Sequence, residues 1–164
     1  MTRRHWARLV ATVAVVATMV GCMARVSNGT ITDVERAVQS ALPHAVEVEV
    51  QHNTRPGIGA SRLEVYIRMP GPSMTPDELL AVLAAIDDEL PARFSPPIAI
   101  LLRVNASETE HGELGDIHPV ADELRFDVGW GARNDLMFER SDLAAYLRWH
   151  DAGAIGTPPQ RRVN

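Results

Sequence analysis

The densest group of side chains that could do chemistry lies between Glu108 and His118, in the stretch ETEHGELGDIH. It holds two imidazoles among four carboxylates. Imidazole and carboxylate groups are common ligands of Zn²⁺, and carboxylates also bind Ca²⁺. Glu110, His111 and His118 are therefore the candidate metal ligands. Their spacing matches no familiar ligand pattern, and an ordinary acidic surface loop would have the same composition.

Other polar groups also allow a chemical and a structural interpretation. Residues 87–89 are three consecutive acids at the end of an expected helix, where they could do acid/base work in a cleft or form a solvated helix face. Gly57 and Gly59 could bind an anion through their backbone, or belong to an ordinary loop. Trp130 stands between two glycines and could be an exposed aromatic platform or a core residue.

Familiar catalytic and nucleotide-binding motifs are absent from the chain. It contains no G-x-S-x-G elbow, no P-loop, no H-E-x-x-H and no C-x-x-C. We therefore expect a non-enzymatic protein with no catalytic residue and no cofactor. An enzyme whose site has an unfamiliar form is the remaining alternative.

The amino-terminal segment has the pattern of a targeting sequence. Arg3, Arg4 and Arg8 precede a run from Leu9 to Ala24 that carries no charge. A membrane-spanning helix needs about 20 apolar residues, and this run is shorter and includes two threonines and a glycine. The pattern favours a signal peptide.

The run ends at Met19-Val20-Gly21-Cys22, which holds the only cysteine in the chain. This tetrapeptide resembles the lipobox of bacterial lipoproteins. The resemblance implies that residues 1–21 are removed and that Cys22 becomes a lipidated amino terminus, which holds the protein at the extracytoplasmic face of the cell membrane. An uncleaved anchor and ordinary secretion are the alternatives.

Composition limits the protein's partners. All sixteen basic residues are arginine, which we interpret as the GC-rich coding bias of an actinobacterium. Loss of residues 1–21 leaves 143 residues, which is enough for one domain. It also removes three arginines and no acidic residue, so the net charge changes from −5 to −8. So acidic a chain is a poor ligand for nucleic acid.

Two helices and three strands are predicted before residue 107. Thr32 begins one helix in a capping box and Thr75 begins another, each followed by apolar residues at helical spacing. Residues 46–50 and 63–69 alternate strictly and should form an antiparallel pair, while the apolar run 98–106 should form a central strand. The polar face of the pair is the predicted contact surface: Glu47, Glu49, Arg62, Glu64, Tyr66 and Arg68.

After residue 107 the pattern is less regular, and it predicts short helices and strands that extend the same fold. We expect a short helix near 119–124, strands through 126–130 and 136–139, and a last helix capped by Ser141. The organisation is then a linker at 22–29, one domain at 30–152 and a disordered tail at 153–164. The order α-β-β-α-β indicates an α+β fold, a mostly antiparallel sheet with helices on one face, ferredoxin-like or similar to the BON domains.

The first functional hypothesis follows from the tether and the lack of catalytic motifs. It is a membrane-anchored envelope lipoprotein whose domain binds another envelope protein or takes part in an assembly. The alternative is a lipoprotein that binds a metal ion or small ligand through residues 108–118.

Overall fold

The computed structural model describes residues 26–54, 61–71, 74–91, 98–106, 116–127 and 134–159. The predicted signal peptide and Cys22 lie outside the described residues, as do Glu110, His111, Gly57, Gly59 and Trp130. The described elements follow one another in the order α2-β1-β2-α3-β3-α4-β4-α5. This order confirms the predicted α-β-β-α-β arrangement, and it places a short helix, a strand and a last helix after it.

Four strands form one sheet in the order β1-β2-β3-β4. The β1–β2 and β3–β4 pairs are antiparallel and the β2–β3 pair is parallel, so the sheet is mostly antiparallel and the class is α+β, as predicted. The long apolar strand β3 lies inside the sheet, also as predicted, with a paired strand on each side. The strands are β1 (Glu47–Thr54), β2 (Ser61–Met69), β3 (Ile98–Ala106) and β4 (Asp135–Glu139).

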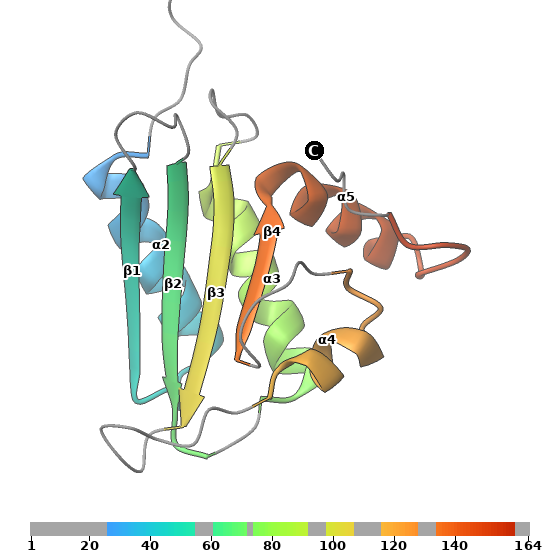
Figure 1. Cartoon of the computed structure of the whole chain (residues 1–164), viewed down its shortest axis with the longest axis horizontal. Coiled ribbons are helices and arrows are strands. Elements are labelled where there is room, and N and C mark those ends of the chain that lie inside the picture. The colour runs from blue at the N-terminus through green and yellow to red at the C-terminus, as the bar shows by residue number, and fades with distance from the viewer. Residues whose placement is uncertain are drawn as a thin grey trace, which may run out of the picture.

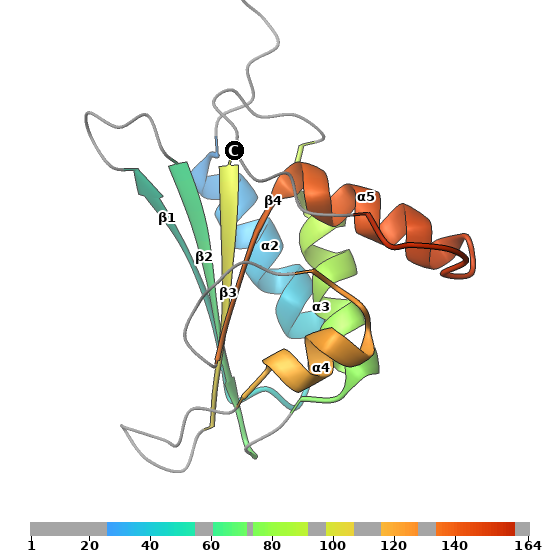
Figure 2. The same ribbon diagram turned by 45° about the vertical axis from the view of Figure 1, so that its right-hand side comes forward.

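All described helices lie on one side of this sheet (Figure 1, Figure 2). Two of them cover the β1–β3 part, and the other two lie beyond them toward β4. Alternate residues of the strands point toward these helices and are buried, which gives a two-layer core. The helices are α2 (Asn28–Ala41), α3 (Pro76–Glu89), α4 (His118–Glu123) and α5 (Arg140–Asp151).

Helix α3 forms where the sequence predicts it. The Thr75 hydroxyl accepts from the amide of Glu78 at 3.3 Å, and the Glu78 carboxylate accepts from the amide of Thr75 at 2.7 Å, which completes the capping box. Leu79, Val82, Leu83 and Ile86 are fully buried against the sheet.

Helix α2 begins before the predicted capping box. Its cap is Ser27, whose hydroxyl accepts from the amide of Thr30 at 3.1 Å. Thr32 lies inside the helix and donates its hydroxyl to the carbonyl of Asn28 at 3.1 Å, so its cap role was a wrong prediction. A serine is as good a cap as a threonine, and the earlier of the two possible starts adds a turn of helix.

Two predictions near the carboxyl end are also wrong. Phe126 and Asp127 belong to no strand, because Arg125 takes a left-handed φ of 57° and turns the chain after α4, which leaves Phe126 in the core. Ser141 does not cap α5. Strand β4 runs directly into that helix, so its last residue, Glu139, occupies the cap position without a side-chain hydrogen bond.

Residues 153–159, inside the segment predicted to be disordered, fold back over the end of α5. The indole of Trp149 donates to the carbonyl of Ile155 at 3.0 Å, and Arg125 donates to the carbonyl of Gly156 at 3.1 Å. Arg125 also lies over the Trp149 ring, 5.2 Å from its centroid. Within the described ranges, the helices are too short or too polar to cross a bilayer.

Candidate functional site

The predicted contact surface occupies the side of the sheet that faces away from the described helices. Cross-strand neighbours on this side include Glu47 with Arg68 and Glu49 with Tyr66. Val48 and Val50 point to the core, because successive side chains of a strand alternate between its faces, whereas Val46 precedes β1 and is exposed. All six predicted residues therefore share one surface, which we call the open sheet face: Glu47, Glu49, Arg62, Glu64, Tyr66 and Arg68.

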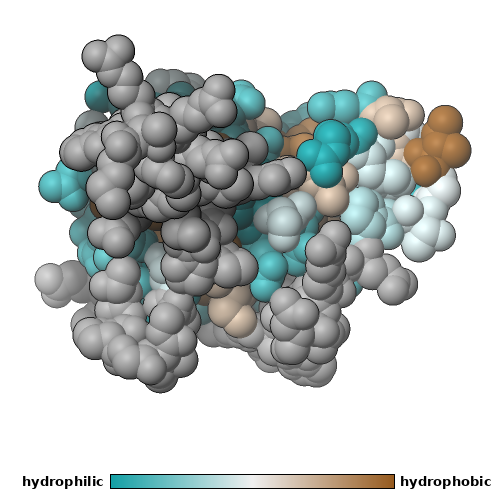
Figure 3. Space-filling model, turned by 90° about the horizontal axis from the view of Figure 1, so that it is seen from above, coloured by the Kyte–Doolittle hydropathy of each residue, from teal (hydrophilic) through white to brown (hydrophobic). Residues whose placement is uncertain are grey.

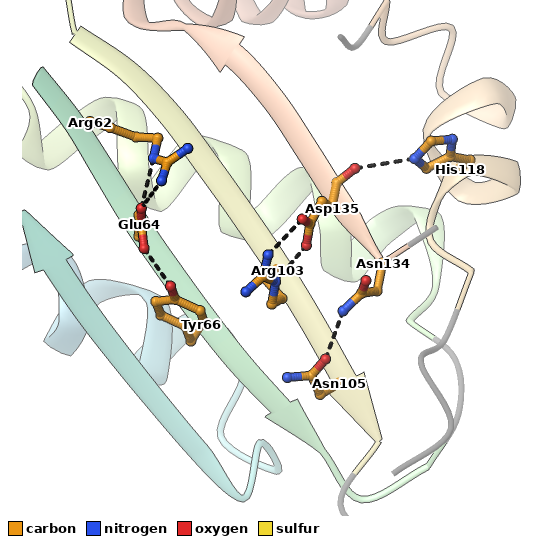
Figure 4. Close-up of polar contacts among 8 residues, drawn as sticks. All are labelled: Arg62, Glu64, Tyr66, Arg103, Asn105, His118, Asn134 and Asp135. Atoms are coloured by element: carbon orange, nitrogen blue, oxygen red, sulfur yellow. Dashed lines mark hydrogen bonds and ion pairs between the residues drawn. The ribbon is translucent and has the colours of Figure 1, made fainter. Parts of the chain in front are cut away.

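Three of these residues form a hydrogen-bonded row along β2 (Figure 4). One oxygen of Glu64 accepts from the guanidinium of Arg62, at 2.6 Å from Nε and 2.5 Å from Nη2. The other oxygen accepts from the hydroxyl of Tyr66. Glu64 is only 4% exposed although it lies on the polar side of the sheet. Both of its oxygens are satisfied, which is what a buried carboxylate requires.

This row changes the protonation of its members. Burial alone would raise the pKa of Glu64, but hydrogen bonds from Tyr66, Asn53 and Arg62, with the charge of Arg62, outweigh it and lower the pKa. The same bond to Glu64, together with burial, raises the pKa of Tyr66. Glu64 therefore stays ionised and Tyr66 stays protonated at neutral pH.

Replacing Glu64 with glutamine should lower the free energy of unfolding by about 1 kcal/mol at pH 7, because the charge-assisted part of these bonds is lost. A carboxyl whose folded pKa is lowered stabilises the protein above its unfolded pKa, near 4.5, and this contribution disappears as the pH falls through the folded pKa. Chemical denaturation at pH 7 and pH 3 measures the difference. An equal cost of E64Q at both pH values would contradict this description.

A second pair continues the polar surface across β3 and β4. Arg103 donates from Nε and Nη2 to the two oxygens of Asp135, at 2.6 and 2.7 Å. Its guanidinium also lies over the Tyr66 ring, 5.5 Å from the centroid, which joins the pair to the β2 row. The bidentate contact raises the pKa of Arg103. Neither residue carries a local pattern that predicts this contact, because the two are 32 positions apart in the chain.

Next to this pair, Asn134, the residue before β4, donates its side-chain amide to Asn105 of β3 at 2.7 Å. His118 lies beside this region, at the start of α4. Its Nε2 donates to the carbonyl of Asp135 at 3.1 Å, so that in the neutral ring the free lone pair is on Nδ1. Figure 4 shows this contact at the border of the network.

Of the three candidate metal ligands, only His118 falls within the described residues. In that part of the chain, no three side chains of His, Cys, Asp or Glu are close enough to hold a metal ion. The imidazole of His118 is already engaged with the backbone of β4. The metal hypothesis therefore gains no support from the geometry around His118.

The acidic segment 87–89 divides into two environments. Asp88 and Glu89 are exposed, as expected of a solvated helix face. Asp87 instead accepts from the guanidinium of Arg140, which also donates to the carbonyls of Asp87 and Leu90 at 3.1 and 3.2 Å. Burial raises the pKa of Asp87 and lowers the pKa of Arg140. This contact joins the end of α3 to the start of α5, and no local pattern around either residue predicts it.

The charges of the open sheet face differ in exposure. Glu64 is buried and hydrogen-bonded, whereas Glu49 and Arg68 are exposed and each contacts one neighbour, Gln51 and Glu47 respectively. The chain was compared with protein-family models, with curated proteins and with solved structures, and no match was found.

Proposed function

We propose that this protein is a cell-envelope lipoprotein that is tethered through Cys22 and binds another envelope protein on the open sheet face. The tether part of the proposal derives from the lipobox-like Met19–Cys22 sequence. The binding part derives from the arrangement of side chains on the sheet. The protein acts by recognition, without a cofactor.

One observation carries the binding part: a broad face of the sheet bears ordered charged side chains, and the described helices all lie on the other face (Figure 2). Side chains in such a row keep their positions before a partner arrives, so less conformational entropy is lost when binding occurs. The bidentate Arg103–Asp135 pair and the Arg62–Glu64–Tyr66 row are both fixed in this way.

The charges of this face favour a protein as the partner. Carboxylates and guanidinium groups alternate across it, with Glu47 opposite Arg68. Nucleic acid requires a continuous basic surface, which a mature chain of net charge −8 does not offer. A protein surface can carry the complementary pattern of both signs, and such a pattern sets the orientation of the two partners.

Exchange of one exposed charge tests this function. A photo-crosslinking amino acid at Glu49 should capture a partner in intact cells, and the same amino acid at Ser40 on α2 should not. With the captured protein purified, Arg68→Glu should weaken its binding by at least about tenfold, because a like charge then faces the partner's acidic group. Calorimetric titration of the purified pair measures the effect.

Arg36→Glu is the matched control. Both arginines are exposed and each pairs with one surface carboxylate, Arg68 with Glu47 at 2.7 Å and Arg36 with Asp33 at 2.9 Å. The two variants therefore change the net charge and a surface ion pair equally, but only Arg68 lies on the open sheet face. Equal binding by both variants, or capture from Ser40 alone, would remove this face as the binding surface.

A further inference from the structure

The tether joins the domain at one end of the sheet. Helix α2 begins after Ser27, at the end where β1 finishes and where β2 and β3 begin (Figure 1). The amino terminus of α5 lies at this end as well, because β4 runs antiparallel to β3. We call this end of the domain the tether end. The opposite end holds the start of β1 and the finish of β2.

The tether is shorter than the sheet. Five Cα-to-Cα steps separate Cys22 from Ser27, and they reach at most about 18 Å. Strand β2 has nine residues and is about 26 Å long. If the domain stood with its opposite end on the bilayer, Ser27 would be farther from the lipid than the tether allows. The inverted orientation is therefore excluded for a chain anchored at Cys22.

Charge acts against the two flat orientations. The open sheet face carries the exposed carboxylates Glu47 and Glu49, and the helix layer carries exposed Asp77, Asp122 and Glu123 away from the tether end. A domain of net charge −8 is repelled by an anionic bilayer, and the repulsion grows with the area of acidic surface brought near. Contact through one end exposes the least of this surface to the lipid.

From these constraints, and on the basis of the proposed lipid tether, we infer that the tether end faces the bilayer and that the open sheet face stands across the membrane plane. The inferred interaction surface is lipid-facing and includes the start of α2, the end of β1 and the end of α3. Figure 3 looks onto this end, and the described residues visible at its left edge are hydrophilic. Ser27 and Asn28, at the start of α2, are exposed polar residues that suit contact with lipid headgroups.

The orientation places the whole open sheet face within about 45 Å of the lipid, the tether and strand lengths together. A partner that docks on this face approaches it from the side, parallel to the membrane. The partner must therefore extend to that height above the bilayer.

Fluorescent labels at four single cysteines measure the orientation. Since lipidation consumes the thiol of Cys22, a maleimide dye would react only with the new cysteine. Asn53→Cys and Glu47→Cys lie on the open sheet face, near the tether end and the opposite end of β1. Glu89→Cys and Asp77→Cys form the matching pair on α3, and all four positions are exposed. Energy transfer to a headgroup dye in vesicles of phosphatidylethanolamine and phosphatidylglycerol gives the height of each label.

The expected result is that Asn53 lies about 20 Å nearer the lipid than Glu47, and Glu89 about 18 Å nearer than Asp77. Equal heights within the sheet pair, or within the helix pair, would overturn the upright orientation. Flotation of the same vesicles separates this failure from loss of the tether. Protein that floats with equal heights contradicts the orientation alone, and protein that does not float contradicts the lipid anchor.

Discussion

Replacing Phe138 with alanine should lower the free energy of unfolding by about 4 kcal/mol. Phe138 is 2% exposed and points from β4 into the core, where its ring meets Phe126 edge-on at 5.1 Å between centroids. Phe126 in turn contacts Tyr146 of α5 at 4.5 Å. Truncation opens a cavity where three parts of the fold pack together through these rings: the sheet, the segment that follows α4, and helix α5. Urea denaturation followed by circular dichroism measures the loss.

The neighbouring residue supplies the control. Met137 lies on the other face of the same strand and is only partly buried. Met137→Ala should cost less than about 1.5 kcal/mol, since fewer methylene contacts are lost there. If the two substitutions cost the same, the assignment of the β4 faces is wrong. Should F138A fail to fold, Phe138→Leu preserves most of the volume and should still cost more than Met137→Leu, a volume-conserving change on the other face of the strand.

Replacing Arg140 with methionine should cost about 3 kcal/mol at pH 7. The substitution leaves the Asp87 carboxylate without its cation, and it removes two donors from the carbonyls at the end of α3. Methionine retains much of the volume of the arginine stem, so the lost charge and hydrogen bonds account for the cost. Thermal unfolding of the variant and the parent protein measures it.

The pH dependence of this variant separates charge from packing. Burial raises the folded pKa of Asp87, so folding favours its protonated form, and stability from this group is lost as the pH rises through that pKa. Without Arg140, whose charge lowers this pKa, the loss becomes larger. R140M should therefore cost more at pH 7 than at pH 4, and adding Asp87→Asn should abolish the difference. A cost that does not change with pH would show that the ion pair is irrelevant.

The elements with local signals could be predicted from the sequence. The capping box of α3 requires only Thr75 and Glu78, which are three positions apart. The alternation in β1 and β2 needed only two short windows, and it placed the six residues of the predicted surface on one face. The ion pair of Glu47 with Arg68, 2.7 Å long, crosses the antiparallel pair that the alternation predicts.

Features that depend on distant parts of the chain could not be predicted. Arg103 meets Asp135 only because β3 pairs with β4, and Arg140 meets Asp87 across 53 positions. Neither residue carries a local pattern that names its partner. The start of α2 was predicted wrongly for another reason. Ser27 and Thr32 can both cap a helix, and local chemistry alone does not choose between them.

The attachment at Cys22 is the central claim, and the intact mass of the protein extracted from bacterial membranes tests it most directly. The expected mass is that of a chain that begins at Cys22, increased by a diacylglyceryl group on the thiol and by any acyl chain on its amino group. Cys22→Ala should abolish this modification and release the domain from the membrane fraction. A membrane-bound wild-type chain that retains residues 1–21, with a free thiol at Cys22, would contradict both the tether and the proposed place of action.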